Sequence, residues 1–319
     1  MKVLVTCPPM LCMMDQLRHL FLRANVEVHC PDVVQTLSEK ELIKLVPQFD
    51  GWIIGDDPAT RSVFTAGKAG RLKAAVKWGI GVDNVDFAAC KELDIPITNT
   101  PMMFGREVAD LAMSYVTSLA RETYLIHDGV RAGRWPKPRG ISLAGRTLGL
   151  VGFGDIGRNV ARRALASDMK VIAYDPFFKL SPELVAVMPA RWPDRIGECD
   201  FIVFTCALTD SNRHMLNAKI LEGVRDGVRI VNVARGPLID EQALSAAIKA
   251  GKVHSAALDV FEVEPLPSES ALRGFEQCIF GSHNGSNTAD AVIRASTRAV
   301  SILFDSLGLE VSRLSEGQS

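Results

Sequence analysis

The sequence predicts an α/β protein with two doubly wound parallel-sheet domains. Short apolar runs bounded by glycine, proline or aspartate alternate along the chain with segments whose apolar residues recur at helical spacing. Near the middle of the chain, a glycine-rich turn at 152–157 separates an apolar run from one of these helical segments. Because strands that alternate with helices form right-handed crossovers, both sheets should be parallel.

The first hundred residues predict the smaller sheet. We expect strands over 3–6, 26–30, 52–54, 74–78 and 95–98, and helices over 17–24, 38–46 and 61–72. Ser38 and Glu41 have the spacing of a capping box, which places a helix start there. Thr100-Pro101 is the expected crossover to the second domain, since the residue before a proline avoids the helical region.

Beyond the crossover, apolar residues at helical spacing predict one long helix from Phe104 to Ala132, which would brace both domains or pack against a second subunit. The larger sheet should use strands over 148–151, 171–174, 201–205, 229–233 and 256–258, with helices over 158–169 and 241–250. A last amphipathic helix, 289–309, is long enough to return to the first domain. The expected domains are therefore 1–100 with 289–319, and 101–288.

The glycine turn predicts a dinucleotide site. Gly152, Gly154 and Gly157 form the Gly-x-Gly-x-x-Gly pattern between a strand and a helix, and Asp175 ends the next strand. The glycines make a tight turn, admit a pyrophosphate and let helix and strand pack closely, while the helix N-terminus attracts phosphate. Asp175 would bind the ribose 2′-hydroxyl group and repel a 2′-phosphate, so NAD is the expected cofactor despite the nearby Lys179.

Composition excludes several other classes of function. The chain has 319 residues and a formal net charge of −1 without a long basic run, which disfavours nucleic acid and anionic membranes as partners. Seven scattered cysteines without a CxxC pair indicate reduced thiols and a cytoplasmic location. The sequence shows no signal peptide, no membrane-spanning apolar stretch and no histidine spacing typical of a metal site.

Three polar residues follow predicted strands of the larger sheet and are suited to 2-keto acid chemistry. Arg235 offers a guanidinium group for a substrate carboxylate. His283 is a candidate proton donor to the carbonyl oxygen, and Glu264 is a candidate carboxylate that favours the imidazolium form. Taken singly, each has an ordinary structural explanation, whereas together with a nicotinamide site they supply what hydride transfer needs.

A second glycine turn follows a strand of the smaller sheet. Gly79, Ile80 and Gly81 stand just after the run ending at Trp78, where ligands of open α/β sheets bind. Their backbone N–H groups are therefore candidates for binding a small anion, although an ordinary turn between strand and helix has the same sequence pattern.

Several motifs in order resemble the D-isomer-specific 2-hydroxyacid dehydrogenase family, closest to its phosphoglycerate-dehydrogenase-like branch. They are Lys77-Trp-Gly-x-Gly-x-Asp-Asn-x-Asp86, Asn99-Thr-Pro101, the glycine turn, Asn232-Val-Ala-Arg-Gly-Pro237, Asp259-Val-Phe-Glu-x-Glu-Pro265 and His283-x-Gly285. The resemblance implies a Rossmann NAD-binding domain inserted into a flavodoxin-like substrate domain, and a homodimer formed through the long helix. It also implies interconversion of a D-2-hydroxy acid and its 2-keto acid.

The resemblance also implies a set of site residues. Arg235, Glu264 and His283 would be catalytic, and Gly79, Ile80 and Gly81 would hold the substrate carboxylate. The cofactor site would comprise Gly152, Gly154, Asp155, Ile156, Gly157, Asp175, Cys206, Ala207, Ala234, Asp259 and Gly285. Two departures stand out: Ser282 replaces the proline that commonly precedes the catalytic histidine, and Cys206-Ala-Leu-Thr209 replaces a His-Leu-Pro-like segment.

The substrate is less well determined by the sequence. Lys77 and Arg106 are candidates for a second anionic group, which favours a phosphorylated or dicarboxylic acid such as 3-phosphoglycerate. A glyoxylate or hydroxypyruvate reductase is the alternative. Formate- or phosphite-type activity is disfavoured by Glu264, and an NAD-sensing corepressor is disfavoured by the short segment after Leu309.

Overall fold

A computed structural model describes residues 1–309 as two units. The first unit comprises Met1–Phe104 and the chain from Asn287 onward, and the second comprises Gly105–Ser286. The division therefore falls four residues after the first boundary expected from the sequence and two residues before the second. The part of the expected first domain at 310–319 lies outside the described residues.

The sheet of the first unit has five parallel strands in the order β2-β1-β3-β4-β5. The strands are β1 (Lys2–Val5), β2 (Glu27–His29), β3 (Gly51–Ile54), β4 (Ala74–Lys77) and β5 (Ile97–Asn99). This is the flavodoxin-like order, in which ligands bind beyond the carboxyl ends of the strands. β1, β3 and β4 lie in the middle of the sheet and are apolar on both faces, as buried parallel strands require.

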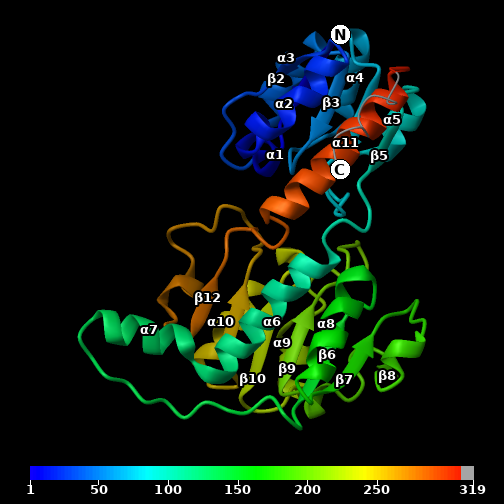
Figure 1. Cartoon of the computed structure of the whole chain (residues 1–319). Helices are drawn as coiled ribbons and strands as arrows, with labels where there is room; N and C mark the ends of the chain where they lie inside the picture. Colours follow the sequence, from blue (N-terminus) through cyan, green and yellow to red (C-terminus); the bar gives the residue numbers. More distant parts are fainter. Residues whose placement is uncertain (310–319) are drawn as a thin grey trace, which may run out of the picture. The chain divides into compact units, whose positions relative to one another are not determined.

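Helices cover both faces of this sheet. They are α1 (Pro8–Cys12), α2 (Met14–Arg23), α3 (Glu39–Leu45), α4 (Arg61–Ala69), α5 (Phe87–Glu92) and α11 (Ala289–Ser306), with a 3₁₀ turn at η1 (Val46–Gln48). The capping box predicted at Ser38 and Glu41 is formed, with both reciprocal hydrogen bonds present. Figure 1 shows α11, drawn in red, lying along the strands of this unit, where it packs on β3, β4 and α2.

The sheet of the second unit has seven parallel strands in the order β12-β11-β10-β9-β6-β7-β8. They are β6 (Thr147–Val151), β7 (Lys170–Tyr174), β8 (Met188–Ala190), β9 (Phe201–Phe204), β10 (Val228–Asn232), β11 (Val253–Leu258) and β12 (Cys278–Phe280). Strand order reverses between β6 and β9, as in the Rossmann fold, so the dinucleotide crevice is expected there. The predicted fold class is confirmed.

The helices of the second unit are α6 (Gly105–Arg121), α7 (Thr123–Arg131), α8 (Asp155–Ala166), α9 (Ala218–Gly223) and α10 (Glu241–Lys249). Short 3₁₀ turns occur at η2 (Pro182–Leu184), η3 (Ile196–Glu198), η4 (Gly236–Leu238) and η5 (Ala271–Gly274). α6 packs against α8 and also contacts β10 and β11 (Figure 1). Because the crossovers on the two sides of β6 run in opposite directions, α8 covers one face and α9 and α10 the other.

The expectation of one continuous helix over 104–132 is wrong. The helix breaks at Glu122, which adopts a left-handed conformation with φ 52° and separates α6 from α7. The carbonyl group of Leu119 accepts a hydrogen bond from Nε of Arg229, at 3.2 Å, in the last turn of α6. The buried Arg229 of β10 thus binds a carbonyl group in the last turn of α6. The left-handed Glu122 then changes the direction of the chain before α7 begins.

Candidate active site

The glycine turn of the second unit joins β6 to α8, and two of its three glycines have no space for a Cβ atom. Gly152 has φ +97°, and a Cβ atom there would lie 2.6 Å from the backbone nitrogen of Cys206. A Cβ atom at Gly157 would lie 2.2 Å from the carbonyl oxygen of Gly152. At Gly154, by contrast, a Cβ atom would meet no atom within 4 Å. The open side of the turn is therefore at Gly154, where a pyrophosphate can approach the backbone.

Helix α8 begins at this open position. Gly154 is its N-cap residue and provides no side-chain cap, while Asp155 and Ile156 form the first turn. The N-terminal N–H groups of a helix attract anions, so the chain offers a phosphate-binding end here. One carboxylate oxygen of Asp155 is buried without a hydrogen-bond partner among the described residues, and a Cβ atom at Gly105 would touch this carboxylate. Asp155 therefore packs against the start of α6.

Asp175 follows β7 directly and its carboxylate is fixed by two backbone amides. Its Oδ2 accepts a hydrogen bond from the N–H of Phe153 at 2.6 Å, and its Oδ1 accepts one from the N–H of Phe177 at 2.7 Å. The acid is therefore tied to the glycine turn, at the position where a ribose hydroxyl group is bound in Rossmann sites. The turn, the helix end and this acid together fit NAD.

Cys206 and Ala207 follow β9, the strand beside β6. Cys206 lies directly against Gly152, and burial raises the pKa of its thiol to about 12, so it stays protonated at neutral pH. The side-chain amide of Asn212 donates a hydrogen bond to the carbonyl group of Ala207 at 2.8 Å. The segment is therefore held beside the glycine turn.

His283 and Glu264, predicted as a pair from the sequence, are in contact. Nδ1 of His283 lies 2.7 Å from Oε2 of Glu264, and each side chain is 22% exposed. The other carboxylate oxygen, Oε1, accepts a hydrogen bond from the backbone N–H of Phe261 at 2.9 Å. Because Glu264 is anchored at one oxygen, its second oxygen fixes the orientation of the imidazole ring.

The loop that carries His283 is bound to Asp259. Oδ2 of Asp259 accepts a hydrogen bond from the N–H of Gly285 at 2.8 Å, and Oδ1 accepts one from the N–H of Asn284 at 3.2 Å. The backbone carbonyl group of Asp259 accepts a third hydrogen bond, from the N–H of His283, at 2.7 Å. Both Asp259 and Gly285, expected from the resemblance to contact the cofactor, thus also shape the histidine loop.

Arg235 follows β10 and sits in a turn that packs on the loop carrying Glu264. The side chain of Asn232 brackets the turn: its amide donates to the carbonyl group of Arg235 at 2.9 Å, and its oxygen accepts from the N–H of Ala234 at 3.0 Å. A Cβ atom at Gly236 would lie 1.8 Å from the carbonyl carbon of Phe261. Glycine is thus required where the two loops touch.

In the first unit, Lys77 is buried and ion-paired. Its Nζ lies 3.0 Å from Oδ1 of Asp56 and 2.9 Å from the carbonyl oxygen of Trp78, and its side chain is only 3% exposed. Asp56 was not predicted from the sequence. The signal was present, because Asp56 follows β3 almost directly, at the same carboxyl edge of the sheet as the Gly79 turn.

The turn after β4 has Gly79 at φ +114°, and the N–H of Gly79 donates to the hydroxyl group of Thr100 at 2.8 Å. The carbonyl group of Ile80 accepts a hydrogen bond from the side chain of Asn99 at 3.2 Å. The Asn-Thr-Pro motif therefore holds this turn through hydrogen bonds of Asn99 and Thr100. Since Thr100 already binds the N–H of Gly79, Ile80 and Gly81 are the better placed of the three for an anion.

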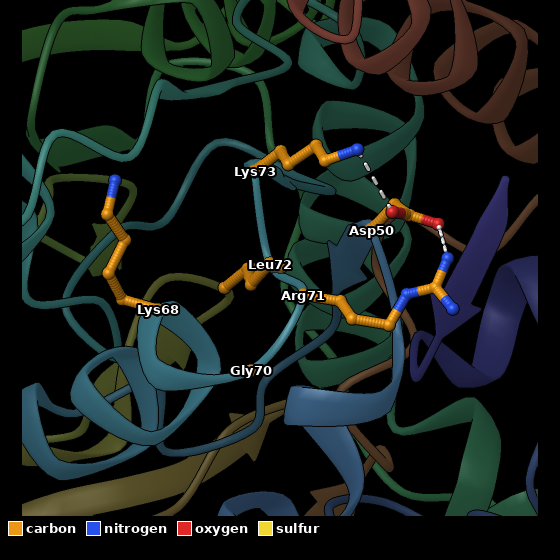
Figure 2. A pocket seen from close by; sticks show the side chains of 6 residues that line it. All are labelled: Asp50, Lys68, Gly70, Arg71, Leu72 and Lys73. Carbon is orange, nitrogen blue, oxygen red and sulfur yellow. Dashed lines mark hydrogen bonds and ion pairs between the residues drawn. The ribbon is translucent and has the colours of Figure 1, made fainter.

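The remaining predicted residue, Arg106, is exposed in the first turn of α6 and belongs to the second unit, whereas Lys77 belongs to the first. A separate hollow of about 510 Å³ in the first unit is lined by Asp50, Lys68, Gly70, Arg71, Leu72 and Lys73. Figure 2 shows Arg71 and Lys73 both reaching the carboxylate of Asp50. Asp50 and Lys73 precede their strands, so this hollow lies at the edge opposite the Gly79 turn.

Comparison with known proteins identifies the family. A model of the NAD-binding domain of D-isomer specific 2-hydroxyacid dehydrogenases matches residues 113–285. The chain belongs to this dehydrogenase family. It is therefore an NAD-dependent oxidoreductase of D-2-hydroxy acids and their 2-keto acids, which confirms the resemblance, the reaction class and the cofactor predicted from the sequence.

Individual relatives of this dehydrogenase differ in substrate. A hydroxypyruvate reductase of Thermotoga maritima is 40% identical over 281 residues, covering 86% of this chain and 90% of the relative. A D-3-phosphoglycerate dehydrogenase of Methanocaldococcus jannaschii is 35% identical over 303 residues, covering 93% of this chain but only 55% of the relative. The chain thus spans about half the length of that phosphoglycerate dehydrogenase.

Solved structures agree over nearly the whole chain. A protein of Thermus thermophilus matches with a TM-score of 0.85 at 31% identity, covering 97% of both chains. A glyoxylate reductase of Paecilomyes thermophila matches with a TM-score of 0.78 at 27% identity, covering 99% of this chain and 96% of that one. Over residues 1–309, none of the helices is both long and apolar enough to span a membrane.

Proposed function

We propose that this dehydrogenase reduces a short 2-keto acid of the hydroxypyruvate or glyoxylate type to the D-2-hydroxy acid. The observation that carries the proposal is the His283–Glu264 pair at 2.7 Å, in which Glu264 lies on the loop that packs against the Arg235 turn. A proton donor and the carboxylate that orients it are therefore in contact, and the turn that carries Arg235 lies in the same unit, which binds NAD.

Each residue has a separate task in the proposed reaction. When bound, NADH would supply a hydride to the keto carbon. Arg235 binds the substrate carboxylate through its two parallel N–H groups. With Nδ1 bound to Glu264, Nε2 of His283 is the ring atom that gives a proton to the developing alkoxide. Oxidation of the hydroxy acid reverses both transfers.

The ion pair in the first unit supports a small substrate over a phosphorylated or dicarboxylic one. Lys77 was one of the two cations expected to bind a second anionic group, but Asp56 balances the charge of its buried amine at 3.0 Å. A carboxylate with a 39% exposed side chain at the same edge disfavours a further negative charge. The 40% identical relative from Thermotoga maritima, which matches over most of both chains, is named for the reduction of hydroxypyruvate.

The steady-state kinetics of NADH oxidation test this proposal. We expect kcat/KM to be highest for hydroxypyruvate or glyoxylate and lower for 2-oxoglutarate and phosphohydroxypyruvate. His283→Ala should lower kcat by about 10²- to 10⁴-fold while NADH still binds. Arg235→Ala should raise KM for the keto acid with the NADH Kd unchanged, and an equal loss of both would contradict its role. A preference for phosphohydroxypyruvate would instead identify the substrate of the phosphoglycerate dehydrogenases.

We further propose a cytoplasmic homodimer. The seven cysteines are all free thiols, as expected in a reducing compartment. The region of α7 and the segment after it exposes apolar side chains, with Val130 44% and Trp135 77% exposed. Such side chains are typical of a surface that a second copy covers. Sedimentation of the wild-type protein and of Trp135→Glu tests this, since the variant should shift toward monomer.

A further inference from the structure

The turn that carries Glu264 is held tightly at its first peptide. The N–H of Phe261 donates to the carboxylate of Glu264 at 2.9 Å, so the backbone at Phe261 determines where that carboxylate points. A Cβ atom at Gly236 would lie 2.0 Å from the carbonyl oxygen of Phe261 and 2.4 Å from the backbone nitrogen of Glu262. The peptide between Phe261 and Glu262 therefore lies directly on the residue that follows Arg235.

Glu262 joins this turn to the start of α10 through a reciprocal pair of hydrogen bonds. Its Oε1 accepts from the backbone N–H of Glu241 at 2.9 Å, and its own N–H donates to Oε1 of Glu241 at 2.7 Å. Glu241 is the first residue of α10, so its N–H group has no acceptor within the helix. The positive end of the helix dipole also favours a carboxylate there. Both the backbone and the side chain of Glu262 are therefore fixed by α10.

The second carboxylate oxygen of Glu262 is bound from a third segment. Its Oε2 lies 3.0 Å from Nε2 of His214, in the loop between β9 and α9. The backbone N–H of His214 donates to the carbonyl group of Pro237 at 2.8 Å. Pro237 belongs to η4, the short turn that directly follows Arg235. The side chain of Glu262 thus connects the turn of Arg235, through His214, with the turn of Glu264.

Three carboxylates lie near one another beside these turns, those of Glu241, Glu262 and Glu264. Burial raises the pKa of Glu241, the N–H of Glu262 lowers it, and the negative charges of Glu262 and Glu264 raise it. Because like charges repel, such side chains keep their places only where hydrogen-bond donors hold them. Without the Glu262 carboxylate, the N–H of Glu241 and the ring of His214 lose the acceptor that joins them.

We propose that Glu262 is a positioning residue for the reaction, which holds the turn of Arg235 and the turn of Glu264 against each other. The inference rests on the proposed catalytic roles of Arg235, Glu264 and His283. Glu262 acts through the backbone of Phe261, whose N–H group orients the Glu264 carboxylate toward His283. Loss of its carboxylate should therefore misplace both the proton donor and the guanidinium group, while the NAD-binding turn stays as it is.

Glu262→Ala and Glu262→Gln together test this role. The alanine variant loses both side-chain contacts, whereas the amide oxygen of glutamine can still accept from the N–H of Glu241. For Glu262→Ala we expect kcat for the keto acid to fall about threefold and KM to rise about threefold, with the NADH Kd unchanged. Glu262→Gln should recover roughly half or more of the wild-type kcat/KM, because the bond to α10 is the shorter of the two side-chain contacts.

Glu198→Ala is the matched control. It removes the same side chain in the same unit, where Glu198 is paired with Arg195 at 2.8 Å and is 54% exposed. Its kcat, its KM and its NADH Kd should equal those of wild type. A fall in NADH affinity as large as the fall in kcat/KM in Glu262→Ala would mean that Glu262 only supports the fold of the unit, and would overturn the proposal.

His214→Ala tests the same connection from its other end and leaves the bonds between Glu262 and α10 in place. Alone it should lower kcat/KM about two- to threefold, which decides the matter if Glu262→Ala does not fold. In a Glu262→Ala background it should cause little further loss, because the two residues act in series. Additive losses, wild-type kinetics in His214→Ala, or a glutamine variant as impaired as the alanine variant would overturn the role of Glu262.

Hydrogen exchange separates this inference from the proposed function. Amides of peptides covering 260–264 should exchange faster in Glu262→Ala than in wild type, whatever the enzyme reduces. Unchanged exchange would show that Glu262 does not hold the turn. Absence of keto-acid reduction by the wild type would instead overturn the proposed function.

Discussion

The carboxylate of Asp175 accepts a hydrogen bond from the backbone N–H of Phe153, so the acid that ends β7 is tied to the glycine turn that begins α8. A carboxylate fixed at this point binds a ribose 2′-hydroxyl group and repels a 2′-phosphate. We expect Asp175→Ala to raise KM for NADH at least tenfold and to reduce the preference for NADH over NADPH by about a hundredfold. The ratio of kcat/KM for the two cofactors measures this.

Asp226→Ala is a suitable control for that experiment. Asp226 belongs to the same unit, and its side chain is 88% exposed. Within residues 1–309, its only ion pair is with Lys252, at 2.7 Å. The cofactor preference should not change in this variant. If Asp175→Ala also leaves the preference unchanged, then discrimination against NADPH comes from elsewhere in the site.

A second prediction concerns the effect of the Lys77–Asp56 ion pair on the preference for substrates of different charge. Asp56→Asn keeps the size of the side chain but removes the ion pair of the buried Lys77 amine beside the Gly79 turn. We expect kcat/KM for phosphohydroxypyruvate, relative to hydroxypyruvate, to rise about three- to tenfold. Parallel assays of the two keto acids measure the change.

Glu92→Gln provides the matched control for substrate charge, because Glu92 lies in the same unit and pairs with the exposed Arg61 at 2.5 Å. Its substrate preference should equal that of wild type. A fall of both kcat/KM values by the same factor in Asp56→Asn would mean that the pair supports the turn and does not select the substrate.

The sequence predicted most of the fold because parallel strands are buried on both faces. Each expected strand overlaps the observed one, with ends that differ by up to three residues, and the capping box at Ser38 is formed. The strand over 188–190 was not predicted, because Met188-Pro-Ala190 is short and contains a proline. The break at Glu122 was missed because neither glycine nor proline marks it, although this residue adopts a left-handed conformation.

For the site too, residues in local sequence patterns could be predicted, whereas contacts between residues distant in the sequence could not. Glycine spacing, the acid after β7 and the polar residues after strands could be recognised one at a time. The pairing of Asp56 with Lys77 and of Asp259 with the backbone amides of Asn284 and Gly285 could not, because each joins two separate elements. These contacts determine which predicted charges are balanced, so the sequence alone predicted the reaction class better than the substrate.

A third prediction concerns the acid stability of the first unit. Burial of Asp50 raises the pKa of its carboxyl group, but hydrogen bonds from the N–H of Lys2 and from Arg71 and Lys73 outweigh burial and hold this pKa below its usual value (Figure 2). A carboxyl group with a lowered pKa stabilises the fold above its unfolded-state pKa of about 4, and this stabilisation is lost as the pH falls through the folded-state value.

Asp50→Asn should therefore destabilise the fold at pH 7 by about 1–3 kcal/mol. This value is kept low because Arg71 and Lys73 are half-exposed, and solvent weakens their attraction to Asp50. The difference from wild type should shrink as the pH falls below about 4. Urea unfolding at pH 7 and at pH 3 measures it. Glu27→Gln, which breaks the exposed pair with Lys2, should have almost no effect at either pH. A difference that does not change with pH would show that the Asp50 charge does not stabilise the fold.

The two glycines around the start of α8 should respond to the same substitution in opposite ways. A Cβ atom at Gly154 would meet nothing within 4 Å, whereas one at Gly157 would lie 2.2 Å from the carbonyl oxygen of Gly152. We expect Gly154→Ala to melt within about a degree of wild type but to bind NADH at least tenfold more weakly, because the methyl group occupies the space that the pyrophosphate needs. Gly157→Ala should lose about 1–3 kcal/mol of stability, because α8 must move away from β6. Thermal melting and NADH fluorescence titration of both variants measure these effects. Normal NADH affinity in a stable Gly154→Ala protein would show that the pyrophosphate does not approach the turn at its open glycine.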